Sequence, residues 1–482
     1  MALSASLIRG GFERLRRPEW FFLVVFVGFG AWFVALVPPG WNSDEPNHLF
    51  RAEQISHGEL LPEVWTGADG SVQSGGAVPA ELIAMLARTK ALTGAVFTGP
   101  VFDPSAKVPD VVQDAGGDVL GPADFDPRVL ADFRNTAIYS PMAYAPQVPA
   151  FWLGRLLSLS FWSITIVGRV FGLAAAGAAV FWAIRWVPWG KLVFVAAALL
   201  PGFVSQAAAF GADSAVLALW AMLVALTLRA VASTGPLTWR TWLCLAALAA
   251  ALGLTKLPYA AAAAVLLVVP LCRREPVGVR RFAVAVGWTL AALLPAVVWT
   301  GSTADAALSL KSDAVMSAQL SGLLSSPLGY PHILYRTFFT DKVGDVYSSL
   351  FGNFVWLSSP LPSLYVVLAV VMLMLSVFTT DPRESILLPN RAERIGYRVW
   401  LLVVAAGVAI VTATAVYLNY TPVGAATVEG YQGRYLLPSV IAVGLALVGN
   451  PLTRQGVPRV SIRVLSVVVL AGAVLTLIAR LY

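Results

Sequence analysis

Two adjacent carboxylates, Asp44 and Glu45, follow directly after an apolar run that ends at Val37 and is long enough to cross a bilayer. Charged groups are costly at that boundary, so their presence favours a functional role. Pro46 suits the first turn of a helix, and His48 lies four residues after Asp44, so the two side chains can share one helix face. Asp44 could then act as a general base on a bound hydroxyl group. The alternative is a helix cap beside a membrane anchor.

Further polar residues are expected on the same side of the membrane, where the ends of other apolar runs meet. Asp213 lies between two such runs without a basic neighbour, and Lys256 lies between two others at a proline-based turn. Cations can neutralise a departing phosphate, and arginine grips phosphate through two hydrogen bonds. Each residue taken singly could equally be a topology marker. The candidate catalytic residues are the acid pair, Asp44 and Glu45. The candidate binding residues are His48, Arg169, Asp213, Lys256, Tyr259, Gln432 and Arg434, and Glu429 lies shortly before the last two in the sequence.

The composition indicates a polytopic all-α membrane protein. Of the 482 residues, 58% are hydrophobic and only 12% are charged, whereas about a quarter of the residues in a soluble domain carry charge. A bilayer admits only helices or closed barrels, and apolar runs of about 20 residues have the length of helices. The net charge of +7 comes from arginines and lysines in short loops, so it reports topology and not a nucleic-acid partner. No glycine-rich nucleotide-binding motif occurs.

The arginine-rich loops predict about eleven transmembrane helices with the N-terminus inside. Residues 139–161 are ambiguous, because three prolines interrupt an apolar sequence. A full crossing there would place the arginines of residues 273–281 outside, whereas helices lying on the outer surface keep them inside, so we predict surface helices. The predicted spans are residues 20–37, 164–184, 191–209, 214–231, 239–255, 258–272, 281–299, 361–379, 399–418, 435–449 and 463–480.

This topology divides the chain into five segments. Between residues 66 and 128 the sequence is rich in glycine, proline, serine and aspartate and has weak periodicity, so we expect irregular loop there, with a short helix over residues 80–89. The segments are residues 1–37, the inner N-terminus and first transmembrane helix; 38–163, an outer loop with juxtamembrane helices; 164–299, transmembrane helices two to seven; 300–358, a second outer loop; and 359–482, transmembrane helices eight to eleven.

Several of these motifs, taken in order, resemble a known superfamily. The pair Asp44-Glu45, the proline-containing residues 139–144, and Arg169 near the start of the second span are similar to features of the C-type membrane glycosyltransferases, called GT-C. A closer resemblance, to a bacterial family of membrane proteins of unknown function usually placed near GT-C, covers most of the chain and is weakest over residues 60–130. It rests on residues 44–48, 201–213, 256–259 and 432–438.

The resemblance implies a GT-C-like fold in the bacterial cytoplasmic membrane and transfer of a sugar from a polyprenyl-phosphate donor to an extracytoplasmic glycan or lipid acceptor. It implies that Asp44 is the general base, that Glu45 contacts donor or acceptor, and that Asp213 is a second acid. Lys256 and Arg434 would hold the lipid phosphate. A single displacement assisted by a base predicts inversion at the sugar. We expect no soluble C-terminal domain of the kind that larger members carry, which leaves acceptor recognition to the two outer loops.

A divalent ion and two other functions stay open at this point. Asp44, Glu45 and Asp213 could hold Mg²⁺ or Mn²⁺, with His48 and His57 as further ligands, and GT-C members differ in their need for metal. A transporter or flippase of lipid-linked glycans would place charged residues deep within the spans. A non-catalytic envelope-assembly protein would tolerate substitution of the acids and cations.

Overall fold

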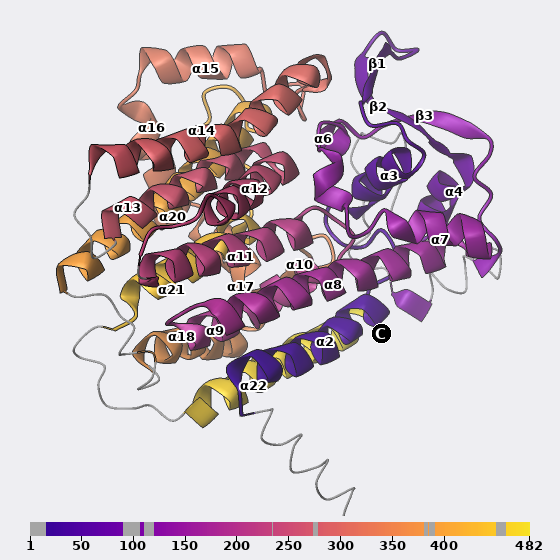
Figure 1. Ribbon diagram of the computed structural model, residues 1–482. Helices are drawn as coiled ribbons and strands as arrows, with labels where there is room; N and C mark the ends of the chain where they lie inside the picture. The colour runs from indigo at the N-terminus through magenta and orange to yellow at the C-terminus, as the bar shows by residue number, and fades with distance from the viewer. Residues whose placement is uncertain are drawn as a thin grey trace, which may run out of the picture.

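The computed structural model describes residues 16–89, 107–109, 120–233, 235–272, 278–379, 384, 391–449 and 459–482. Long helices lie side by side in a bundle, and a small sheet with short helices covers one end, here called the sheet end (Figure 1). Within the described ranges, six helices are long and apolar enough to cross a membrane. They are α2 (Pro18–Leu36), α8 (Phe161–Trp186), α11 (Asp213–Ala232), α14 (Val279–Ser302), α20 (Arg391–Asn419) and α22 (Arg459–Leu481).

Other predicted spans fall on shorter apolar helices. One of them, η3 (Leu257–Leu267), is a 3₁₀ helix that continues into α13 (Val268–Cys272). A 3₁₀ helix rises about 2.0 Å per residue, so these few residues extend about 30 Å, the thickness of a hydrocarbon core. The number of crossings stays a prediction. The remaining short apolar helices are α12 (Trp239–Thr255), α18 (Ser363–Phe378) and α21 (Leu437–Leu447), which follows η6 (Gly433–Leu436).

The predicted span over residues 191–209 needs a correction, because it forms two buried helices and not one. These are α9 (Lys191–Ala198) and α10 (Pro201–Ala207). Proline lacks a backbone N–H and pushes the residue before it out of the helical region, and Leu200 accordingly has an extended ψ of 136°. The predicted single helix is therefore interrupted between Ala198 and Pro201.

The sheet end contains a three-stranded antiparallel sheet that the sequence did not predict. Its strands β1 (Glu63–Thr66), β2 (Val72–Pro79) and β3 (Arg128–Asp132) lie in that order. The expected irregular loop was wrong for β2 but the expected short helix is confirmed as α4 (Ala80–Arg88). The glycines of β2 made the segment resemble a loop in the sequence, but close packing in the sheet requires them. A Cβ on Gly75 would lie 2.0 Å from the Ala131 carbonyl oxygen.

Helix α3 (Glu45–Ser56) is the centre of the sheet end, with eleven of its twelve residues buried. The helix contacts β2, α6 (Arg134–Ala137), η2 (Pro141–Tyr144) and α7 (Pro149–Leu157). These neighbours satisfy its polar side chains, since Arg51 donates to the Tyr139 and Leu60 carbonyls and Glu53 accepts from two arginines. Residues 139–161 thus form short helices up to the start of α8, and not one long span.

The second polar insertion, residues 300–358, is mostly helical and supports the site. It contains η4 (Ala304–Ala306), α15 (Met316–Ser325), α16 (Gly329–Tyr335), η5 (Arg336–Thr340), α17 (Val343–Phe351) and the short strand β4 (Asn353–Phe354), which pairs with β5 (Ser359–Pro360) directly after the insertion. Val346 of α17 forms a small core with Tyr417 and Tyr431. Helix α17 also contacts η6, which carries one of the predicted phosphate-binding residues.

Candidate functional site

Four charged side chains from distant parts of the sequence meet at the sheet end. Asp44 precedes α3, Asp213 begins α11, Lys256 lies between α12 and η3, and Arg434 lies on η6. The Arg434 guanidinium donates to the Asp44 carboxylate, and its Nε is 3.6 Å from an Asp213 carboxylate oxygen. The Lys256 ammonium donates to Asp213. We call this alternating series of two acids and two cations the ion-pair chain, and its four members were all predicted from the sequence.

Burial makes the ion-pair chain asymmetric. The side chains of Arg434, Lys256 and Asp213 are 6%, 9% and 12% exposed, whereas that of Asp44 is 33% exposed. Buried charges are tolerated when each has an opposite partner, and here two acids balance two cations. Asp44 is therefore the member that water and a soluble group can reach, while the other three lie behind it.

Asp44 does not cap α3, so the helix-cap alternative is not supported. Its φ of 62° is in the left-handed region, which is uncommon for a residue other than glycine, and its side chain makes no capping hydrogen bond. The carboxylate contacts Arg434 and lies 3.5 Å from the Asn135 amide. Burial is the largest single influence and opposes ionisation, but the nearby positive charges, Arg434 first among them and Lys256 also, together hold the pKa of Asp44 below its usual range. The carboxylate is ionised and already paired.

Two tyrosine rings flank the cations and were not singled out from the sequence. Lys256 Nζ is 5.7 Å from the Tyr139 ring centroid and 5.5 Å from that of Tyr435, and the Arg434 guanidinium is 5.4 Å from the Tyr435 ring. Such distances allow cation–π attraction. Tyr259 is buried and donates a 3.3 Å hydrogen bond to the Tyr435 carbonyl. Tyr259 thus helps to position Tyr435, and the substrate contact expected for Tyr259 stays a prediction.

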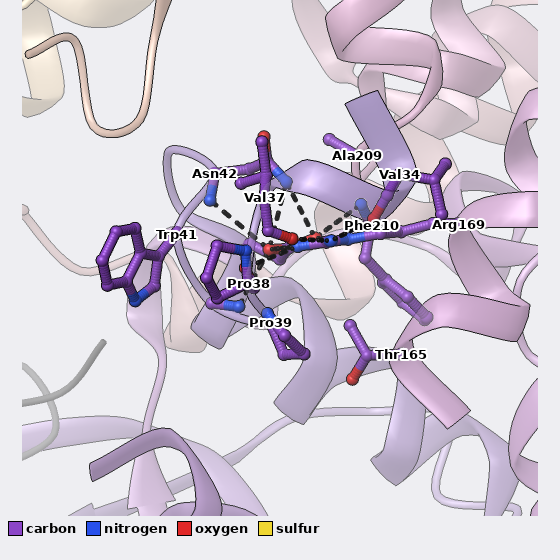
Figure 2. Close-up of polar contacts among 12 residues, drawn as sticks. Val34, Val37, Pro38, Pro39, Trp41, Asn42, Thr165, Arg169, Ala209 and Phe210 are labelled. Atoms are coloured by element: carbon purple, nitrogen blue, oxygen red, sulfur yellow. Dashed lines mark hydrogen bonds and ion pairs between the residues drawn. The ribbon is translucent and has the colours of Figure 1, made fainter. Parts of the chain in front are cut away.

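Glu45 and Arg169 form a separate pair, and neither side chain is exposed to solvent. Figure 2 shows Arg169 among its polar contacts near Val34, Val37 and Pro38. Arg169 Nε donates to one Glu45 oxygen at 2.7 Å and Nη2 donates to the other at 2.5 Å. The remaining guanidinium N–H groups point to backbone carbonyls at the end of α2. In total, Arg169 donates to Val34, Val37, Pro38 and Glu45, while Glu45 also accepts from Gly40, Asn42 and Phe210.

This geometry corrects the roles expected for Glu45 and Arg169. A guanidinium has five N–H donors, and all five of Arg169 are used inside the protein. Neither side chain is available to a substrate in this arrangement. The pair instead joins the end of α2 to α8 and to the loop before α11. It fixes the turn that aims the adjacent Asp44 at Arg434.

His48 is buried and makes a structural hydrogen bond. Its Nδ1 lies 2.7 Å from the Tyr144 hydroxyl, and its ring packs against Tyr139 and Tyr144. Burial, with Lys256 nearby, lowers the pKa of His48 from 6.5 to about 4, so the ring is neutral at pH 7. His57 is exposed at the far end of α3 and does not join the site.

The low pKa of His48 predicts a pH dependence of stability. Between pH 6.5 and about 4 the unfolded chain binds a proton on this residue that the folded protein excludes, so the free energy of unfolding falls as the pH falls through this window. The total effect is about 3 kcal/mol. His48→Gln removes it, whereas His57→Gln at an exposed position does not. Unfolding midpoints in detergent across the window measure the difference, and parallel curves for His48→Gln and wild type would contradict the assignment.

Gly433 sets the position of Arg434, and Gln432 before it offers a hydrogen-bond acceptor. Gln432 Oε1 is buried and has no hydrogen-bond partner within the described ranges, so it can accept from a ligand. The Gly433 backbone N–H donates to the Ser349 hydroxyl at 2.7 Å. A Cβ on Gly433 would lie 2.1 Å from the Val346 carbonyl oxygen, so only glycine lets η6 approach α17 so closely. Glu429 lies elsewhere, on the surface, 3.7 Å from Lys311.

Gly433→Ala is expected to destabilise the protein by about 1–3 kcal/mol, because the helix backbone facing its Cβ cannot yield. Arg434 shifts with it, so the contact with Asp44 weakens. Gly344→Ala is the matched control on α17, where a Cβ meets no atom within 4 Å. The midpoints of thermal unfolding compare the two variants. Equal midpoints would show that η6 can move away from α17 without loss.

The arrangement does not fit a divalent ion. Within the described ranges, no group of three or more His, Cys, Asp and Glu side chains is placed to hold a metal. Asp44 and Asp213 each already face a cation, and Glu45 is occupied by Arg169. A second positive charge at these carboxylates would compete with the ones present. The residues suggested as ligands for Mg²⁺ or Mn²⁺ therefore act here as partners of arginine and lysine.

Comparison with known proteins gives one family. The pattern of a family described as "Predicted membrane protein (DUF2142)" matches residues 26–443, which include every member of the ion-pair chain. No curated protein and no solved structure matches the chain.

Proposed function

The chain belongs to the DUF2142 family of predicted membrane proteins, whose function is unknown, and from that premise we propose that it is a membrane glycosyltransferase. Its donor is a sugar linked to polyprenyl phosphate, and its acceptor is a cell-envelope glycan or lipid. The bundle is GT-C-like, with about eleven spans, in the bacterial cytoplasmic membrane, and the sheet end faces the extracytoplasmic side.

The ion-pair chain is the observation that carries this proposal. It combines a partly exposed carboxylate with two buried cations, and it stands at the end of apolar helices where a lipid phosphate can arrive from the bilayer. The flanking rings of Tyr139 and Tyr435 offer apolar faces to a sugar or a prenyl chain. The unsatisfied Gln432 Oε1 supplies an acceptor for a sugar hydroxyl.

The reaction is a single displacement. The acceptor hydroxyl oxygen forms a bond to the anomeric carbon while the bond from that carbon to the phosphate oxygen breaks. The hydroxyl proton passes to Asp44, and the bonding electron pair leaves with the phosphate. Arg434 and Lys256 neutralise the charge that grows on the phosphate in the transition state. Attack from the face opposite the phosphate inverts the configuration at the sugar.

The other two functions receive less support from the geometry. A flippase for lipid-linked glycans needs charged groups along a path through the bundle, whereas the ion-pair chain is confined to one end. An assembly protein has no need of two buried cations beside an exposed acid. The same variants distinguish all three functions, because only the transferase depends on the ion-pair chain for turnover.

Lys256→Gln tests the proposal directly. In protein reconstituted with a panel of polyprenyl-phosphate sugars and envelope glycan acceptors, this change is expected to reduce transfer by roughly a hundredfold or more, since it removes one cation at the departing phosphate. Lys311→Gln removes a partly exposed lysine that contacts Glu429 and the Tyr420 ring, away from the ion-pair chain, and serves as the control. Equal transfer by Lys256→Gln and wild type would reject the assigned role.

A further inference from the structure

A groove at the opposite end of the bundle, between α11 and α12, is separate from the ion-pair chain. Its volume is about 480 Å³, and its lining includes Arg229, Arg240, Thr238 and Thr241. Asp213 begins α11 and Arg229 lies in its last turn, so the two sites are about 24 Å apart along the helix. No acidic side chain lines the groove.

The two arginines of the groove lack anionic partners. Within the described ranges, neither Arg229 nor Arg240 makes an ion pair or a hydrogen bond. Each guanidinium lies over an indole ring. The guanidinium carbon of Arg229 is 6.0 Å from the Trp186 ring centroid, and that of Arg240 is 5.7 Å from the Trp239 ring centroid. Tryptophans gather at the level of the lipid headgroups, so the guanidinium groups are at the depth where lipid phosphates lie.

The rest of the groove is apolar. Leu226, Leu245 and Cys244 continue its wall along α11 and α12, away from the arginines. A groove for a free anion would be closed by polar groups, whereas this one joins two cations to a hydrocarbon-like surface. We propose that it binds the phosphate headgroup of an anionic membrane lipid, with the first part of an acyl chain against the leucines. This site is independent of the proposed transferase activity.

The experiment uses the chain's own cysteines. Cys244 lines the groove and is exposed, while the other cysteine, Cys272, is buried, so maleimide labels the groove selectively. In full-length protein in detergent, dioleoyl phosphatidylglycerol is expected to slow the labelling of Cys244, while dioleoyl phosphatidylcholine is not. Native mass spectrometry of the same samples counts the retained phosphatidylglycerol.

The double variant Arg229→Gln with Arg240→Gln is expected to weaken phosphatidylglycerol binding by at least about tenfold, because two charge-assisted contacts are lost. The matched control is Arg185→Gln with Arg280→Gln, which removes the same charge near the same end and leaves the groove intact. Equal weakening in both double variants would reduce the effect to general charge and overturn the proposal. So would unchanged binding in the groove variant, or protection of Cys244 by inorganic phosphate alone. The unfolding midpoint verifies that each variant is folded.

Discussion

Asp44→Asn is expected to abolish sugar transfer and, at the same time, to tighten the binding of polyprenyl phosphate. Transfer falls by about 10²–10⁴-fold, the range for loss of a general base. Binding tightens because Asp44 occupies the Arg434 guanidinium in the free protein, so an incoming phosphate must displace a carboxylate before it can contact Arg434. The amide is isosteric but carries no charge, and a gain of about tenfold in affinity follows from removing one competing ion pair.

The same competition explains how a carboxylate with a lowered pKa can serve as a base. While Arg434 donates to it, Asp44 has little affinity for a proton. When phosphate takes over Arg434, the favourable charge is withdrawn from Asp44 and its pKa rises toward the usual range. In the proposed transfer, donor binding therefore strengthens the base, and we expect an acceptor hydroxyl to lose its proton only when the donor is in place.

Two measurements on one preparation test this prediction. Equilibrium binding of polyprenyl phosphate to Asp44→Asn is compared with transfer by the same protein. Asp345→Asn serves as the control, since the Asp345 side chain is 76% exposed and its ion-pair partner is Lys342 at 3.7 Å. Weaker binding by Asp44→Asn would mean that phosphate does not engage Arg434. Undiminished transfer would remove Asp44 from its role as the base.

The ion-pair chain could be found from the sequence because each member is a charged residue beside an apolar run, and two of them, Asp213 and Lys256, are lone charges there. Asp213 and Lys256 are in places where water is scarce, so each needs an opposite charge from another segment. Elements with clear hydrophobic length, such as α2, α8 and α11, were predicted nearly to their ends for the same reason. Length and lone charge are both local signals.

The different partners of Asp44 and Glu45 could not be predicted from such local signals. The two acids are adjacent, and their directions depend on the left-handed backbone of Asp44, which itself depends on Arg169, 124 residues from Glu45. The burial of α3 is equally non-local, because its polar side chains are satisfied by β3, α7 and the segment before η2. Strand β2 was missed because glycine has a low strand propensity. Its glycines are present because Ala131 and Gln54 pack too closely against them to leave room for a Cβ.

The Glu45–Arg169 pair is expected to dominate the stability of the sheet end. Glu45→Gln leaves the Arg169 guanidinium buried without a countercharge, and the cost of breaking such a pair is about 3–5 kcal/mol. Arg169→Met is expected to lower the free energy of unfolding by a similar amount, because it leaves the Glu45 carboxylate without a countercharge and the carbonyls at the end of α2 without a hydrogen-bond donor. The midpoint of thermal unfolding in detergent falls accordingly for either single variant.

The double variant Glu45→Met with Arg169→Met separates the contribution of the ion pair from that of the backbone hydrogen bonds around it. It removes both charges, so it is expected to recover part of the loss, but the Gly40 and Phe210 N–H groups remain without their acceptor and recovery is incomplete. Arg336→Met is the control, because the side chains of Arg336 and its partner Asp341 are 38% and 37% exposed, which predicts a change of less than about 1 kcal/mol. If the double variant were no more stable than the singles, the backbone contacts, and not the ion pair, would be what holds α2, α3 and α8 together beneath Asp44.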